Sequence, residues 1–305
     1  MTTRPEEPIG PALRTILGAL LTKINDSADK VLHDSDPDDI HDLRVATRRT
    51  RTLLSQMPRV FADDAVAPFK RGFKRIGNVT GACRDLDVWL EAIDEHREAS
   101  ASIGGAPLDP LEVLMRRQRD TARIRVNQEL SSLWFPDLLS RWQCVLETPP
   151  AGLSKRASRP TAMVAAARIL KAHQRLLKHG NALPEEPLAA QFHRLRIDGK
   201  KLRYLLEFFG QLFDADRSHQ LIEDLKCLQD VLGGINDREI QLEALNTLTE
   251  SPDPATAIAI EHHRHFLRES LADFRSIFGD KFRAFADPEV TRSFRRLFGE
   301  SKNGP

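Results

Sequence analysis

The chain has 305 residues, of which 41% are hydrophobic, 29% charged and 6% aromatic, with a single tyrosine. Its 45 Lys and Arg residues nearly balance 44 Asp and Glu residues, so the formal net charge is only +1. A near-neutral chain is not a general polycation, which argues against indiscriminate coating of nucleic acid and requires any anion site to arise from local clustering. The composition favours helices over strands, and the length suits two ordinary domains or one duplicated domain.

No sequence feature directs the chain to a membrane or to an oxidising compartment. The three cysteines, Cys83, Cys144 and Cys227, are odd in number and follow no metal-ligand spacing, as is typical of a reducing cytosol. The N-terminus has no apolar signal core, and no run approaches the roughly 18 apolar residues of a membrane span. We therefore expect a cytoplasmic, soluble protein.

Apolar residues at helical spacing predict an all-α fold, and no segment alternates as a strand does. After a flexible tail at 1–9, the predicted helices of the first part lie at about 11–32, 36–57, 68–80, 84–98, 110–130 and 136–146. In the second of these, Asp36 is a good N-cap and Pro37 a good first-turn residue, and Pro58 ends the helix.

A linker rich in Pro, Gly and Ser follows at 148–160, and the order of helices then repeats. The predicted helices of the second part lie at about 161–178, 186–210, 217–232, 236–248 and 254–276, with short pieces to 298. The predicted organisation is a first helical half at 10–147 and a second at 160–298, with flexible tails at 1–9 and 299–305.

Two of the predicted helices carry the same basic pattern. The stretch His41-Asp-Leu-Arg44-Val-Ala-Thr-Arg48-Arg49-Thr-Arg51 returns 152 positions later as His193-Arg-Leu-Arg196-Ile-Asp-Gly-Lys200-Lys201-Leu-Arg203. The register continues without a gap to position 88 and pairs Phe61 with Phe213, Lys74 with Lys226 and Asp85 with Asp237. Such a register indicates duplication, so we expect two four-helix-bundle-like halves with pseudo-two-fold symmetry around a basic groove.

On an ideal helix the cations of each copy fall on one narrow face. The first copy aligns His41, Arg44, Arg48 and Arg51 and leaves Arg49 aside; the second aligns His193, Arg196, Lys200 and Arg203 and leaves Lys201 aside. Acidic residues avoid both faces, and like charges at these spacings cost roughly a few tenths of a kcal/mol per pair. Arginine forks bind phosphate oxygens bidentately and lysines add point charges, so the faces predict a site for a chain of phosphates. A bound anion should favour the charged forms of His41 and His193.

These segments resemble the CHAD domain family, the conserved-histidine α-helical domain. The resemblance rests on the H-x-x-R-x-x-x-R-R-x-R helix, on Arg84-Asp85-Leu86-Asp87-Val88, on 192–204 and on Leu232-Gly-Gly-Ile-Asn-Asp237. It covers about residues 10–298 and implies a pair of four-helix bundles that binds inorganic polyphosphate along a basic channel. Lys200 and Lys201 depart from the family pattern by replacing arginines, and Gly199 lies inside the second basic helix.

Family members often carry a triphosphate-tunnel (CYTH) domain on the same chain, for which 305 residues leave no room. The resemblance therefore implies a stand-alone polyphosphate-binding domain that targets the protein to polyphosphate granules.

Further cations are expected to extend the site, with ordinary surface charge as the alternative. Lys74 and Lys226 are paired by the repeat, and the fifth helix of each half contributes Arg119, Arg123, Arg264 and Arg268. The helix at 161–178 carries a stripe whose first-half counterpart is weak, formed by Arg168, Lys171, Arg175 and Lys178.

Three interpretations of the basic faces stay open: polyphosphate binding, nucleic-acid or nucleotide binding, and a phosphohydrolase or phosphotransferase acting on polyphosphate. Single-strand binders usually stack bases on aromatic rings, and only Tyr204 lies near the basic helices. Nucleic acid is therefore not the expected partner, and the oligomeric state stays open.

No motif assembles a catalytic or metal site. Asp85 and Asp237 are interpreted as helix caps or as partners of basic-face arginines, and His41-Asp42 lacks the further histidines of an HD-type phosphohydrolase. The cluster His262, His263 and His265 is interpreted as surface histidines. Because no phosphate loop, nucleophile elbow or zinc motif is present, we expect a binding module that is not an enzyme and needs no cofactor.

Overall fold

The structure is a computed structural model that describes residues 3–34, 36–102, 107–148, 154–247 and 253–299. Within these ranges the regular secondary structure is helical, and the one β-type pairing is an isolated bridge between Pro8 and Pro160. The predicted all-α class is confirmed. None of the described helices combines the length and the apolar character needed to cross a bilayer.

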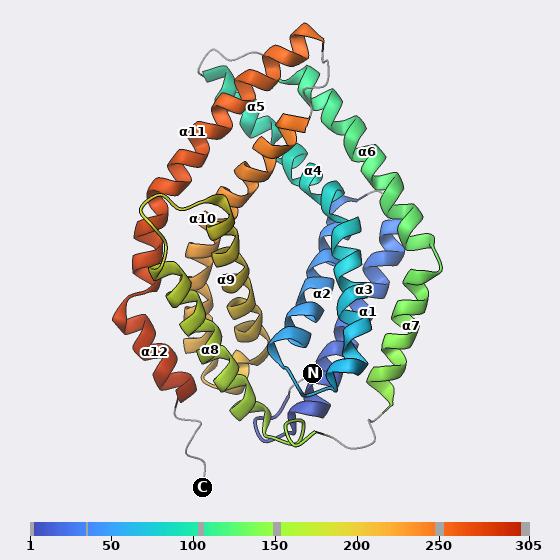
Figure 1. Cartoon of the computed structure of the whole chain (residues 1–305), viewed down its shortest axis with the longest axis vertical. Coiled ribbons are helices and arrows are strands. Elements are labelled where there is room, and N and C mark those ends of the chain that lie inside the picture. Colours follow the sequence, from blue (N-terminus) through green and yellow to red (C-terminus); the bar gives the residue numbers. More distant parts are fainter. Residues whose placement is uncertain (1–2, 35, 103–106, 149–153, 248–252, 300–305) are drawn as a thin grey trace.

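The helices form two groups that stand side by side (Figure 1). The first group contains α1 (Ile9–His33), α2 (Pro37–Gln56), α3 (Asp63–Val79), α4 (Gly81–Glu91), α5 (Ile93–Ser102), α6 (Asp109–Ser131) and α7 (Trp134–Glu147). The second contains α8 (Thr161–Asn181), α9 (Ala189–Phe209), the 3₁₀ turn η1 (Gly210–Leu212), α10 (Ala215–Thr247), α11 (Pro254–Phe285) and α12 (Pro288–Gly299). Helices α2 and α9 lie at the centre of Figure 1, one in each group, and pack against each other.

Two hydrophobic cores hold the helices together. The larger core is continuous across both groups and includes Leu17 of α1 and Ile169 of α8, which are fully buried. The smaller core, with Trp89 of α4 and Leu267 of α11 at its centre, lies where α4, α6, α10 and α11 meet at one end of the molecule (Figure 1). Burial of this kind contributes about 25 cal/mol per Å² of apolar surface, so the two groups are joined by packing as well as by the chain.

Burial in α2 and α9 follows one pattern at the offset of 152 positions. The buried apolar pairs include Ile40 with Phe192, Leu43 with Leu195, Leu53 with Leu205 and Leu54 with Leu206. In α1 and α8 the same offset relates Leu13 to Ala165, Leu17 to Ile169 and Ile24 to Leu176. Because burial fixes the rotation of a helix about its axis, each cation of α2 occupies the angular position of its counterpart in α9.

The break predicted between two helices at 232–236 does not exist, because α10 runs unbroken from Ala215 to Thr247. Gly234 lies against α11, where a Cβ atom would come within 2.4 Å of Phe274 Cε1. The Gly-Gly pair therefore permits close packing of two helices instead of ending one. At the equivalent place in the first group the chain does break, since α3 ends at Val79 and α4 begins at Gly81.

Other helix ends differ from the predicted ones for local reasons. Helix α3 starts at Asp63, so Pro68 lies inside it, beyond its first turn, where the proline removes one helical hydrogen bond. The helix predicted at 84–98 is divided at Ala92 into α4 and α5, and α11 extends to Phe285. The predicted N-cap of α2 is confirmed, because the Asp36 carboxylate accepts a hydrogen bond from the Asp38 backbone N–H at 2.9 Å.

Part of the expected flexible lead is bonded to the expected linker. The Ile9 N–H donates to the Arg159 carbonyl at 2.9 Å, and the Thr161 N–H donates to the Glu7 carbonyl at 2.8 Å. The other predicted tail and linker residues at 1–2, 149–153 and 300–305 lie outside the described residues.

Candidate functional site

The basic faces of α2 and α9 converge at Arg48. Its charge acts on His41 and Arg44 of its own helix and on Arg196 and Lys200 of α9. Arg48 is half-buried, and no acidic side chain of the described residues forms an ion pair with it. The predicted alignment on two helices thus becomes one cluster of positive charge between the two groups.

Lys200 shows how strongly this cluster concentrates positive charge. Burial and the charges of Arg48, Arg196 and Arg203 together lower the pKa of Lys200 to about 6, although Asp237 opposes the shift. Like Arg48 and Arg51, Lys200 has no ion pair in the described part of the chain. An anion at this place would restore the charged form of the lysine.

Arg44 and Arg196 are held by the protein itself. The Arg44 Nη1 donates to the Gly77 carbonyl at 2.7 Å and to Thr80 Oγ1 at 3.0 Å, so Arg44 also caps the last turn of α3. The Arg196 Nη2 lies 3.8 Å from Asp237 Oδ1, which fits the interpretation of this aspartate as a partner of the basic face. Burial lowers the pKa of both guanidinium groups.

Asp85 is the acidic counterpart of Asp237 in the first group. Burial raises the pKa of Asp85 and the nearby Asp237 raises it further, whereas the charges of Arg44 and Arg196 lower it. The two aspartates therefore lie within electrostatic range of each other, among arginines of both basic helices.

The two repeated histidines have different neighbours. His193 Nδ1 donates to Asn236 Oδ1 at 2.9 Å, which leaves Nε2 of the ring available for a ligand. The position equivalent to Asn236 in the first group is Arg84. Partial burial lowers the pKa of His41 and the charge of Arg84 lowers it further. Arg84 was not among the predicted site residues. Its position directly before Asp85 in the repeated segment could have indicated that it lies close to the site.

Arg49 and Arg203 connect the two basic helices through one carboxylate. The Arg49 Nη2 lies 3.3 Å from Glu207 Oε2, and the Arg203 Nε lies 3.3 Å from Glu207 Oε1. The Arg49 guanidinium also lies 4.6 Å from the ring centre of Phe208, a cation–π distance. Both arginines thus have structural contacts, whereas Arg51 is exposed and has no ion pair among the described residues.

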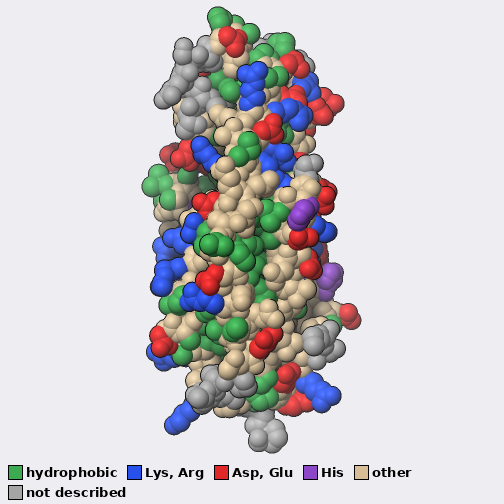
Figure 2. Space-filling model, turned by 90° about the vertical axis from the view of Figure 1, so that its right-hand side faces the viewer, with side chains coloured by type: hydrophobic (Ala, Val, Ile, Leu, Met, Phe, Trp, Pro, Cys, Tyr) green, Lys and Arg blue, Asp and Glu red, His purple; other side chains and the backbone are tan. Residues whose placement is uncertain are grey.

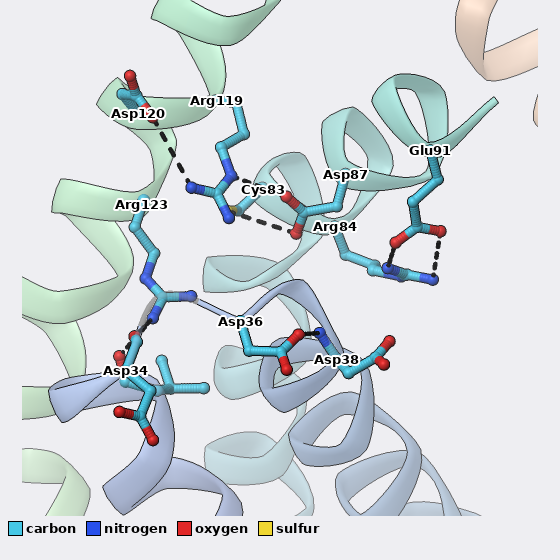
Figure 3. Close-up of polar contacts among 11 residues, drawn as sticks. Asp34, Asp36, Asp38, Cys83, Arg84, Asp87, Glu91, Arg119, Asp120 and Arg123 are labelled. Atoms are coloured by element: carbon cyan, nitrogen blue, oxygen red, sulfur yellow. Dashed lines mark hydrogen bonds and ion pairs between the residues drawn. The ribbon is translucent and has the colours of Figure 1, made fainter. Parts of the chain in front are cut away.

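The two arginines predicted to extend the site from the fifth helix of the first half, Arg119 and Arg123, have partners of their own (Figure 3). The Arg119 Nε lies 2.8 Å from the buried Asp87 carboxylate. Arg123 is buried and its Nη2 donates to the carbonyls of Val31, at 2.7 Å, and Asp34. Arg123 is therefore a cap on the C-terminal end of α1, which corrects its expected place on the binding surface.

The remaining predicted cations are exposed or locally paired. Lys74 and Arg268 are exposed on α3 and α11. The Lys226 Nζ lies 2.7 Å from Glu223 Oε1, and Arg264 forms an ion pair with Glu261. On the face over α6 and α7, basic and acidic side chains are interspersed along the molecule (Figure 2), in contrast to the acid-poor faces of α2 and α9.

The interpretation of the three clustered histidines as surface residues is wrong for His263. Its ring is fully buried, stacks on Trp89 and accepts a hydrogen bond from Trp89 Nε1 at 3.0 Å, whereas His262 and His265 are exposed. The signal for this was the position of His263 on the apolar side of its helix. Among the described residues, no group of three or more His, Cys, Asp or Glu side chains could hold a metal ion.

A hollow of about 740 Å³ separates the exposed sides of α8 and α9. Three members of the basic stripe predicted on α8, namely Lys171, Arg175 and Lys178, line it together with Lys201, which falls to the side of the basic face of α9. The fourth member, Arg168, is not among the lining residues. Arg194 and His179, which also line the hollow, were not predicted, because single cations outside the repeated pattern carry no signal of their own.

Comparison with known proteins identifies the family and the fold. The family model of the CHAD domain matches residues 15–246. The crystal structure of the CHAD domain from the plant Ricinus communis is similar with a TM-score of 0.77 and 25% identity, covering 93% of this chain and 94% of that one. PptA from Streptomyces chartreusis has a similar fold, with a TM-score of 0.69 and 19% identity over 90% of this chain and 99% of that one.

A sequence relative has the same region within a longer protein. The uncharacterized protein MT2285 of Mycobacterium tuberculosis (strain CDC 1551 / Oshkosh) is 26% identical over 220 residues, which are 71% of this chain and 42% of that protein. The chain thus spans less than half the length of this relative. Because the family model covers most of the chain and a solved CHAD domain superposes on nearly all of it, the chain belongs to the CHAD domain family.

Proposed function

We propose that this chain binds inorganic polyphosphate along the converging basic faces of α2 and α9. The observation that carries the proposal is the proximity of Arg48 and Lys200, two half-buried cations from different helices without an acidic partner among the described residues. The cost of holding cations this close together in the free protein shows in the lowered pKa of Lys200, and a chain of phosphates supplies the closely spaced negative charge that would offset it. The resemblance to the CHAD family gives the same expectation.

We infer in addition that the two groups of helices arose by duplication and are related by a pseudo-two-fold axis. Support comes from the burial pattern that repeats at 152 positions in α1 and α8 and in α2 and α9. Under this inference Arg48 and Lys200 are equivalent residues. They would approach each other near the axis, where a linear ligand could contact both helices.

Polyphosphate is a better ligand for this site than nucleic acid. Tyr204, the aromatic residue that the sequence placed near the basic helices, is 3% exposed and has no free ring face to stack on a base.

The candidate catalytic acid Asp237 is engaged by Arg196 and Asn236. We therefore propose a binding module without catalytic activity, which associates with polyphosphate granules through this site.

The test compares two double variants that each remove two basic side chains. Arg48→Ala with Lys200→Ala removes the centre of the cluster, whereas Arg117→Ala with Arg125→Ala removes two exposed arginines of α6 that have no ion pair in the described structure. Titration with long-chain polyphosphate should show an affinity loss of about a hundredfold or more for the first variant, because two charge-assisted contacts are lost, and less than about threefold for the second. Equal losses would contradict the proposal.

The same proteins separate the alternative functions. Competition of labelled polyphosphate with RNA and ATP should leave polyphosphate as the preferred ligand, and preference for RNA would favour nucleic-acid binding. Release of orthophosphate from the bound chain, lost in the Arg48 and Lys200 variant but kept in the control, would instead assign a phosphohydrolase activity.

A further inference from the structure

The hollow between α8 and α9 is built from cations of both helices and contains a single acidic residue. Lys171, Arg175 and Lys178 follow one another along α8, and Arg194 and Lys201 face them from α9. The acidic residue, Asp198, is 4% exposed and lies beneath these cations. A surface of this kind attracts anions and offers few places for a cation or an apolar group.

Asp198 arranges the cations of this hollow. His179 Nδ1 donates to Asp198 Oδ2 at 2.6 Å, and His179 Nε2 accepts a hydrogen bond from Arg194 Nη2 at 3.1 Å. Lys201 Nζ lies 3.6 Å from the other carboxylate oxygen. One nitrogen of Arg194 is thus oriented by the protein, and its other donors remain for a ligand, as in sites where an outer carboxylate fixes a histidine.

The equivalent surface of the first group has only part of this basic character. A hollow of about 370 Å³ lies between α1, α2 and α9, and at the offset of 152 positions its Ala19, Asp42 and Ala46 correspond to Lys171, Arg194 and Asp198. Two cations remain there, Lys23 and Arg49, which correspond to Arg175 and Lys201, and they lie beside Glu207 and the apolar Ile16, Leu20 and Phe208. The fold therefore accepts Ala and Asp at the positions of Lys171 and Arg194, so it does not itself require these two cations.

His193 belongs to both surfaces. It is a member of the basic face of α9, and it also lines the α8–α9 hollow. A helix with its side chains is about 10–12 Å across. A flexible ligand can therefore pass around α9 from one surface to the other and stay in contact with basic side chains.

On this basis, which rests on the proposed function, we propose that the α8–α9 hollow binds a further segment of the same polyphosphate chain. Long chains would then contact the α2–α9 faces and the α8–α9 hollow together, and chains too short to pass around α9 would occupy the α2–α9 faces alone. The hollow would make affinity depend on chain length through the effective concentration of the second segment.

The test gives the second hollow the residues of the first. The variant Lys171→Ala with Arg194→Asp has the same charge change as the control Arg117→Ala with Arg125→Asp on α6, and all four residues are exposed. Each protein is titrated with long-chain polyphosphate and with tripolyphosphate at several salt concentrations. For long chains we expect the variant to bind about tenfold more weakly than the control and its log–log salt slope to fall by about one to two units. Tripolyphosphate affinity should change less than about twofold relative to the control.

Each contrary outcome has a distinct meaning. Equal long-chain affinity and salt slope in variant and control would overturn the inference while leaving the proposed function intact. A loss of equal size for long chains and for tripolyphosphate would also overturn it, because the hollow would then not be an extension. Failure of the wild-type protein to bind either ligand would overturn the proposed function, and the inference with it.

Discussion

Lys200 differs from the other cations of the α2–α9 faces because its charge depends on pH in the accessible range. Its pKa is lowered to about 6 by burial and by the neighbouring arginines, so it is mostly neutral in the free protein at pH 7. A phosphate chain would raise this pKa, and binding should therefore take up a proton. Affinity should rise as pH falls from about 9 towards about 6.

Calorimetric titration in two buffers with different ionisation heats would count this proton. Lys200→Arg should keep binding but lose the uptake, because a guanidinium remains charged throughout this range. Lys74→Arg, at an exposed lysine of α3, is the control and should behave as wild type. If the Lys200→Arg protein took up as many protons on binding as wild type, the proton would be bound by His41 or His193, as the sequence alone led us to expect.

The position of the basic residues could be predicted from the sequence, whereas their partners could not. Helical spacing placed Arg48 and Lys200 on acid-free faces, because the angle between residues on one helix is a local property. Glu207, which joins Arg49 to Arg203, is set by how α2 packs on α9. The burial of Arg123 depends on where α1 ends, a contact 89 residues distant along the chain.

Arg123 should matter for stability and not for binding. Its guanidinium satisfies two carbonyl groups at the C-terminal end of α1, and these would lose their partner in Arg123→Ala. We expect the free energy of unfolding to fall by about 2–3 kcal/mol in urea denaturation, since hydrogen bonds to charged groups contribute about 1.5–3 kcal/mol each and solvent would replace part of them. Arg117→Ala, on the exposed side of the same helix, should change stability by less than about 0.5 kcal/mol. A weakened affinity for polyphosphate in a folded Arg123→Ala protein would contradict this and show that Arg123 contributes to binding.

At the scale of the elements, two adjacent glycines of α10 should respond to alanine in opposite directions. A Cβ atom at Gly233 has no neighbour within 4 Å, whereas one at Gly234 would lie 2.4 Å from Phe274 Cε1. Gly233→Ala should therefore stabilise the protein by about 0.5–1 kcal/mol through helix propensity. Gly234→Ala should destabilise it by about 1–3 kcal/mol through overpacking between α10 and α11. Urea denaturation of the two variants would measure both changes, and equal effects would show that the close approach of α10 and α11 is absent.

The same glycines explain why helix existence was more predictable than helix ends. Gly233 and Gly234 are a local signal for a helix end, yet the contact of Gly234 with Phe274 of α11 keeps α10 continuous. Pro68 is a local signal for a helix start, yet α3 begins at Asp63 and contains the proline beyond its first turn. Both outcomes depend on contacts or positions that spacing rules do not contain.

For the whole molecule, the end where α4, α5 and α11 meet joins the two groups around a buried histidine pair. The His96 and His263 rings lie 5.1 Å apart, and His96 also lies 5.2 Å from the Phe266 ring. Both ring nitrogens of His96 lack a hydrogen-bond partner among the described residues. Burial and the charge of Arg238 of α10 together lower the pKa of His96 to about 4, and burial, His96 and Arg238 lower the pKa of His263 to about 3.

These histidines should make the junction between the two groups sensitive to acid. In the unfolded chain each takes up a proton below its ordinary pKa of about 6.5, whereas in the folded protein each stays neutral to a much lower pH. Stability is therefore fully present above about pH 6.5 and is lost as pH falls towards about 4, at up to about 1.4 kcal/mol per pH unit for each histidine. Arg238, whose own charge is countered by Glu95 and Asp237, is the charged group facing the pair from α10.

The variant His96→Leu tests this junction, because it removes one proton-binding group and two unpartnered nitrogens while keeping an apolar side chain in the small core. We expect its free energy of unfolding to equal or exceed that of wild type at pH 7. Between pH 6.5 and pH 5 it should fall less steeply, by up to about 1.4 kcal/mol per pH unit. His262→Leu, at an exposed position of α11, is the control and should keep the wild-type slope. Urea denaturation at several pH values would give both slopes. If His96→Leu kept the wild-type slope, acid sensitivity would have to come from other groups, such as His173, which is buried between α8 and α12 and whose pKa is lowered to about 4.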